Sequence, residues 1–214
     1  MNSPPPLLAT PARAPQGPIA WLTRAWSVCL CVLALFATPL TAAVNDAIEV
    51  TSARLEASAD GEAWVLAADF NVPLPARLEE TVNGGVALYY VAEFEAYRPR
   101  WYWWDERLTQ RGQTYRLSYH ALTRQYRVTL NGYQQQFTNL GDAVRAMSLV
   151  RGWKVLEFDR LKPGATYDVY VRMRLDVTQL PKPFQLTAIT NRDWNQQAEW
   201  KHFTFSPETT KSAQ

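Results

Sequence analysis

The stretch that decides the fold runs from residue 86 to residue 130 and reads VALYYVAEFEAYRPRWYWWDERLTQRGQTYRLSYHALTRQYRVTL. From Val86 to Ala96 every second residue is apolar, and two glutamates lie between them, which is typical of a half-buried β-strand. The same period of two recurs from Thr114 to Ala121 and from Tyr126 to Leu130. Because the segment between these last two runs is short, they predict a β-hairpin.

An aromatic block with the sequence RPRWYWWDE lies between the first two of these strands, at residues 98 to 106. Pro99 lacks a backbone donor, so the chain turns or begins a new strand there. If the chain is extended after Pro99, the aromatic side chains alternate between two sides, and both sides need cover. In one interpretation the core covers one side and a helix or loop covers the other, because large aromatic side chains mainly bury area. In the other, an aromatic pair stays exposed and binds a ligand or partner.

This block supplies the candidate binding surface. Its members are Arg98, Arg100, Trp101, Tyr102, Trp103, Trp104 and Asp105.

Alternating patterns elsewhere add further strands. They are predicted at residues 48–58, 64–70, 133–138, 153–158, 167–177, 184–188 and 200–205. One short helix is predicted from Pro75 to Gly84, and a second is capped by Asn139 and ends at Gly152. About ten short strands with two short helices predict a mainly β fold, a two-sheet antiparallel sandwich of which the immunoglobulin-like sandwich is one version.

The first 43 residues have the pattern of a secretory signal peptide with a long Pro- and Ala-rich start. Arg24 precedes a short apolar run, and small residues follow up to Ala43, after which we expect cleavage. The mature protein is then periplasmic, with a single β-sandwich domain at residues 44–207 and a flexible tail at 208–214. Extending the apolar run to Ala43 gives about 19 residues, so the alternative is an uncleaved anchor that leaves an inner-membrane protein facing the periplasm.

Removal of the leader changes the charge and the cysteine content. The whole sequence has 22 Lys and Arg against 20 Asp and Glu. Without Arg13 and Arg24 the basic and acidic side chains balance, which argues against a nucleic-acid partner. Both cysteines, Cys29 and Cys31, leave with the apolar run, so the mature domain has no disulfide.

No catalytic group of residues stands out in the mature chain. The histidines are His120 and His202, which fall on different predicted strands, so a shared site needs the two to meet. Glu93 and Glu95 lie two apart on a strand and have the residue types of a glycosidic acid and base, but a solvated sheet surface is the simpler explanation. Phosphate loops and dinucleotide fingerprints are missing. We therefore predict no catalytic residues, no metal and no cofactor.

Several runs together resemble the proteobacterial domain-of-unknown-function family 4390 over essentially the whole mature chain. These runs are RPRWYWWDE at 98–106, TYRLSY at 114–119, LTRQYR at 122–127, RGW at 151–153, RLD at 174–176, LPKPFQ at 180–185 and NRDW at 191–194. The resemblance implies an exported, all-β envelope domain with no catalytic residues to carry over. It also implies a periplasmic accessory role, since members of the family are encoded near nitrogen-regulation-like sensor kinases.

Two functional hypotheses follow from the sequence. The first is a non-catalytic interaction domain that binds an unidentified envelope or membrane protein, with a sensor kinase as one candidate, through the aromatic block or a strand edge. The second is a small-ligand or glycan-binding module in which Trp101, Trp103 or Trp104 stacks against a saccharide. Soluble saccharides should quench tryptophan fluorescence under the second hypothesis only.

Overall fold

The computed structural model describes residues 47–207, apart from the side chains at positions 189 and 192. These residues belong to the second of two units into which the chain divides, Asn45–Gln214. The predicted signal peptide at 1–43 and the predicted tail at 208–214 lie outside the described residues.

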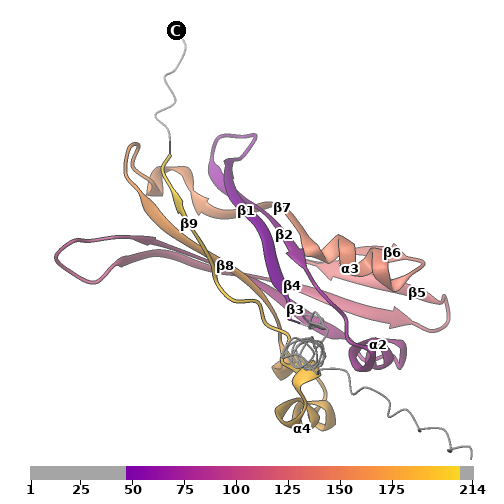
Figure 1. Ribbon diagram of the computed structural model, residues 1–214. Helices are drawn as coiled ribbons and strands as arrows, with labels where there is room; N and C mark the ends of the chain where they lie inside the picture. Colours follow the sequence, from indigo (N-terminus) through magenta and orange to yellow (C-terminus); the bar gives the residue numbers. More distant parts are fainter. Residues whose placement is uncertain (1–46, 208–214) are drawn as a thin grey trace, which may run out of the picture. The chain divides into compact units, whose positions relative to one another are not determined.

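The described part of the chain is mainly β (Figure 1). Its strands are β1 (Glu49–Ala57), β2 (Ala63–Asn71), β3 (Leu88–Arg98), β4 (Glu106–His120), β5 (Gln125–Leu130), β6 (Tyr133–Phe137), β7 (Leu149–Glu157), β8 (Tyr167–Leu175) and β9 (Lys201–Phe205). Its helices are α2 (Ala76–Asn83), α3 (Leu140–Ser148) and α4 (Lys182–Thr190), with short 3-10 turns η1 (Phe158–Arg160), η2 (Val177–Gln179) and η3 (Arg192–Trp194).

The strands form two antiparallel sheets. One has the order β1-β2-β7, and the other has the order β6-β5-β4-β3-β8-β9. The predicted two-sheet antiparallel fold is thus confirmed. The predicted hairpin is β4 with β5, in which Leu117 pairs with Val128.

Strand β3 lies in the middle of the larger sheet, between β4 and β8. Its alternating residues face opposite sides of the sheet, as the period of two predicted. Leu88, Tyr90, Ala92 and Phe94 are all fully buried, whereas Glu93 and Glu95 on the opposite face are partly exposed. In β8 the same alternation buries Tyr167, Val169, Val171, Met173 and Leu175. One face of this sheet is therefore core, and the other is a polar outer face.

The core fills the space between the two sheets. Phe94 of β3 meets Trp153 of β7 edge to face, with ring centroids 6.5 Å apart. Near one end of the core, Trp64 of β2 stacks on Phe158 at 4.9 Å and contacts Phe205 of β9 edge-on at 4.8 Å. Aromatic pairs of this geometry add to the area that they bury, so they help to hold the sheets together.

The helix predicted from Pro75 to Gly84 is confirmed as α2. The start predicted for the second helix is confirmed by α3, but its predicted end is not. Asn139 caps α3 by accepting a hydrogen bond from the backbone N–H of Asp142 at 2.7 Å. The prediction that this helix continues to Gly152 is wrong. It ends at Ser148, because the next residues pair with β2, where Val150 lies opposite Ala68.

A third helix, α4, replaces the strand predicted at 184–188, so the prediction of two helices is wrong. Phe184 and Ala188 pack against the core, and Leu186 between them is exposed, which fits a helix and contradicts a strand that would place all three on one side. Pro181 is the N-cap of this helix, and Pro183 occupies its first turn, where the missing N–H costs nothing.

Candidate functional site

The predicted binding surface lies at the tip of the β3–β4 hairpin, in the segment 99–105, which we call the aromatic loop (Figure 1, the magenta loop at the left). The loop has no strand structure, because β3 ends at Arg98 and β4 begins at Glu106. Of the two possibilities predicted at Pro99, the chain takes the turn, and it is not extended from Trp101 to Trp104. The loop's four aromatic side chains have exposed fractions of 94% for Trp101, 67% for Tyr102, 68% for Trp103 and 85% for Trp104.

These exposures decide between the two interpretations of the aromatic block. The interpretation in which the core and a helix or loop cover both sides is wrong. Trp101 and Tyr102 contact each other edge to face at 5.1 Å, and no described element buries the four rings. The block ends up at a hairpin tip because Pro99 follows β3 directly and the pairing of β3 with β4 stops at Arg98 and Glu106.

The base of the aromatic loop is held by charged groups. Arg98 lies 3.3 Å from the carboxylate of Glu106, and Arg100 also donates a hydrogen bond to that carboxylate. The hydrogen bond from Arg100 lowers the pKa of Glu106, so the carboxylate stays charged at neutral pH. Across the loop, the backbone N–H of Arg100 donates to Asp105 at 3.2 Å. Three of the seven predicted surface residues, Arg98, Arg100 and Asp105, thus shape the loop that presents the other four.

A cavity of about 470 Å³ opens beside the aromatic loop. It is lined by Glu95, Tyr97, Trp104, Asp105, Tyr170 and Trp200. The sequence predicted only two of these residues as part of a binding surface. The others come from β3, β8 and the segment before β9, and only the strand register brings them together, since Glu95 lies directly opposite Tyr170.

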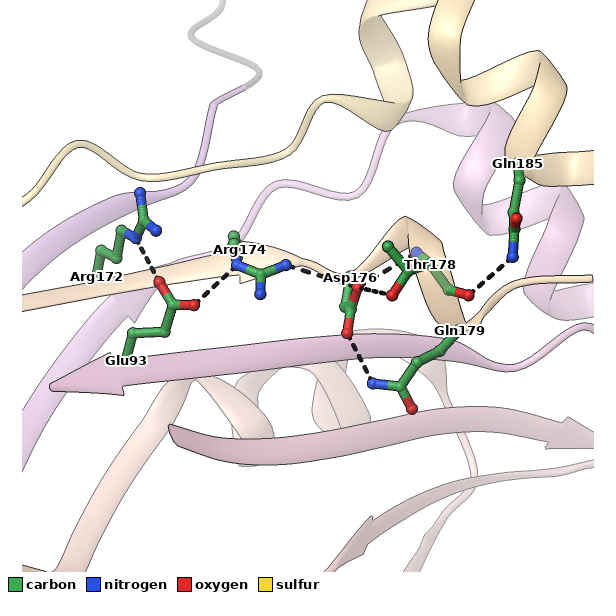
Figure 2. A network of polar contacts seen from close by, with 7 residues as sticks. All are labelled: Glu93, Arg172, Arg174, Asp176, Thr178, Gln179 and Gln185. Carbon is green, nitrogen blue, oxygen red and sulfur yellow. Dashed lines mark hydrogen bonds and ion pairs between the residues drawn. The ribbon is translucent and has the colours of Figure 1, made fainter. Parts of the chain in front are cut away.

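A polar network crosses the outer face of the larger sheet next to this cavity (Figure 2). Glu93 of β3 accepts from two arginines of β8, with its carboxylate 2.5 Å from Nε of Arg172 and 2.9 Å from Nε of Arg174. The ring of Trp200 also contacts Arg172, with the guanidinium carbon 4.2 Å from the ring centroid. Glu93 is therefore held by two arginines of β8 and is not a free carboxylate.

The same network continues to the start of α4. Arg174 lies 3.6 Å from Asp176, which accepts hydrogen bonds from Thr178 and Gln179 (Figure 2). Burial alone would raise the pKa of Asp176, but the hydrogen bonds from Gln179 and Thr178 outweigh it, and the pKa lies below its ordinary value. Gln185 of α4 donates to the backbone carbonyl of Thr178 at 2.7 Å, which ties this helix to the turn η2 that follows β8.

The two histidines do not meet. His202 of β9 contacts Asp168 at 2.8 Å and lies beside the ring of Tyr170, whereas His120 at the end of β4 contacts Thr123. Across the sheet, His202 pairs with Tyr170, and Tyr170 pairs with Glu95. Glu95 in turn pairs with Gln110 of β4, so His202 lies level with Gln110. His120 lies ten residues further along β4, which at strand spacing is about 30 Å away. A triad or zinc site shared by both is thus ruled out by geometry.

In residues 47–207, no three or more His, Cys, Asp or Glu side chains gather in an arrangement that would hold a metal ion. None of the helices in that range has the length and apolar character needed to cross a bilayer.

No curated protein and no solved structure matches this chain. A family model, described as a domain of unknown function (DUF4390), matches residues 45–204. That range includes every strand but the last residue of β9, together with the aromatic loop and the cavity. The chain belongs to the DUF4390 family of domains of unknown function.

Proposed function

We propose that this DUF4390 domain is exported to the periplasm and acts there as a non-catalytic interaction domain that binds another envelope or membrane protein through its aromatic loop. The observation that carries the proposal is the exposure of four consecutive aromatic side chains at one hairpin tip. Soluble proteins seldom expose such a patch unless it binds something, and Trp and Tyr are the residues that dominate the energetics of protein interfaces.

The size of the patch fits a protein partner. A buried Trp or Tyr side chain removes about 150–250 Å² from water, so four of them offer on the order of 600 Å². One partner of an ordinary protein interface contributes about 800 Å². The aromatic loop and a few neighbouring side chains therefore supply the area of one side of such an interface.

The loop is also shaped before it binds. The contacts of Arg98 and Arg100 with Glu106, and of the Arg100 backbone with Asp105, fix both ends of the segment. A binding loop that is already ordered loses less conformational entropy when a partner arrives. This arrangement supports an adhesive role for the loop.

The non-catalytic part of the proposal is supported by the placement of the groups that chemistry would need. The histidines are about 30 Å apart along the sheet, and Glu93 is engaged by two arginines. Export is supported by the signal-peptide pattern of residues 1–43. The family resemblance supports an accessory role beside an envelope sensor kinase. Such a kinase is therefore the first partner to test.

The proposal is tested by capture of partners from envelope extracts with the tagged chain. Trp103→Ala should lower the recovery of the specific partner at least about tenfold, the loss expected for one interface hot spot. Tyr133→Ala is the matched control, because Tyr133 is an equally exposed aromatic residue on β6. Full recovery of the same partner by Trp103→Ala would remove the aromatic loop from the account.

A glycan-binding module is the second candidate, and the observation that favours it is the free ring face of Trp101. Its side chain is 94% exposed and meets Tyr102 edge to face, so a saccharide ring has room to stack on it. Quenching of tryptophan fluorescence by soluble saccharides, lost in Trp101→Ala, would support this candidate. Unchanged fluorescence across a saccharide panel would reject it.

A further inference from the structure

The cavity beside the aromatic loop has walls made mainly of aromatic rings. Tyr97 of β3 and Tyr170 of β8 meet edge to face, with ring centroids 5.8 Å apart. Trp200 forms another wall, and the guanidinium of Arg172 lies over its ring. Trp104 comes from the aromatic loop and completes the lining on that side. Rings from four separate segments of the chain thus surround one space.

The cavity is also acidic. Its lining includes two carboxylates, Glu95 and Asp105, and no lysine, arginine or histidine. Two other acids nearby already have cationic partners: Glu93 has Arg172 and Arg174, and Glu106 has Arg98 and Arg100. Within residues 47–207, Glu95 makes no ion pair.

Glu95 does have one neutral hydrogen-bond donor. The phenol of Tyr97 donates to its carboxylate at 2.6 Å, and this bond raises the pKa of the Tyr97 phenol. The phenol therefore remains a neutral donor. The guanidinium of Arg107, opposite Tyr97 in the sheet, interacts with the phenol but forms no ion pair with Glu95, so the carboxylate keeps its charge. The cavity presents this charge among rings whose faces are themselves attractive to cations.

We infer that this cavity binds an organic cation, an ammonium or guanidinium group with apolar substituents, whose charge faces Glu95 while its substituents lie against Tyr97, Tyr170, Trp104 and Trp200. Aromatic walls with a carboxylate are the arrangement that selects such cations over neutral molecules of the same shape. The inference is independent of the proposed function, because it holds whether or not the exposed rings of Trp101 and Trp103 bind a protein.

Two sources can supply this chemistry, a small alkylated ammonium compound and the side chain of a lysine or arginine on another protein. The volume of about 470 Å³ admits either one. The two are distinguished by which probe binds the purified full-length chain more tightly.

The experiment measures binding by calorimetry and by the fluorescence of the tryptophans. The probes are choline, N-acetyl-lysine methylamide and N-acetyl-arginine methylamide, and 3,3-dimethylbutanol is the neutral compound with the shape of choline. At least one cation should bind at millimolar concentration or below, and the neutral compound should bind at least about tenfold more weakly. Choline as the tightest probe identifies a small ligand, whereas either amino-acid derivative as the tightest identifies a protein side chain.

Variants assign the binding to the cavity. Glu95→Gln keeps the shape of the side chain and should weaken cation binding at least about tenfold. Trp200→Ala should weaken it as well, and Glu79→Gln on α2 is the control that should leave it unchanged. Circular dichroism checks that each variant is folded. If Glu95→Gln does not fold, Asp105→Asn takes its place. Equal binding of the neutral compound, no cation binding, or full binding by the folded charge variants would each overturn the inference.

Discussion

The guanidinium of Arg172 lies over the ring of Trp200, with its carbon 4.2 Å from the ring centroid. Arg172 in turn is held by Glu93 at 2.5 Å. The wall of the cavity therefore depends on an ion pair between two neighbouring strands. This relationship links the stability of the outer face of the sheet to the geometry of the candidate ligand site.

The first prediction concerns Glu93. Its side chain is only 20% exposed, and Glu93→Gln leaves Arg172 without a charged partner and Arg174 with Asp176 alone. We expect the free energy of unfolding to fall by about 2 kcal/mol. Urea denaturation of the full chain measures this loss. Glu157→Gln is the control, because its pair with Arg160 is exposed and should contribute nothing measurable. Equal losses in the two variants would contradict the account of the network.

The second prediction concerns the pH dependence that Asp176 gives to stability. Its pKa in the folded protein lies below the ordinary value of 3.8. A depressed pKa stabilises the fold above the unfolded-state value, and that stabilisation is lost as the pH falls through the folded-state value. We therefore expect the advantage of the native chain over Asp176→Asn, measured by denaturation, to be full at neutral pH and to shrink below about pH 4. A difference that stays constant down to pH 2 would show that the carboxylate charge is not the cause.

The third prediction compares two fully buried tyrosines of the core. The hydroxyl of Tyr90 has no hydrogen-bond partner within residues 47–207, and burial raises its pKa. The hydroxyl of Tyr167 accepts a hydrogen bond from the backbone N–H of Lys162 at 2.8 Å. In thermal denaturation, Tyr90→Phe should leave the free energy of unfolding unchanged or raise it. Tyr167→Phe should lower the free energy of unfolding by about 1 kcal/mol. The reverse order of the two variants would show that the core is organised differently.

The fourth prediction concerns export. Intact-mass measurement of the protein recovered from the periplasmic fraction should give a chain that begins at Val44. Recovery of the uncut chain in the membrane fraction would support the alternative of an N-terminal anchor. Recovery in the cytoplasm alone would contradict the proposed location.

Much of the fold could be predicted because its strands have one buried and one exposed face. In β3 and β8 the alternation of apolar and polar residues was enough to identify the buried side. Helix α4 was missed because Phe184, Leu186 and Ala188 fit a period of two as well as they fit a helix. The prolines at 181 and 183 were the signal that could have separated the two, since they suit a helix start.

The candidate sites were predicted less completely. The composition of the aromatic block indicated a binding surface, but the choice between burial and exposure depended on where β3 and β4 stop pairing. The cavity could not be predicted, because Glu95, Tyr170 and Trp200 are far apart in sequence and meet only through the order β3-β8-β9. No local pattern encodes that order.

The central claim is that the aromatic loop contacts a protein partner in the cell envelope. It is tested most directly by replacing Trp103 with a photo-crosslinking phenylalanine derivative and irradiating living cells. The account predicts one discrete crosslinked product from position 103 and none from position 122, where Leu122 is as exposed but lies in the β4–β5 turn. Discrete crosslinks from position 122 with none from position 103 would contradict it.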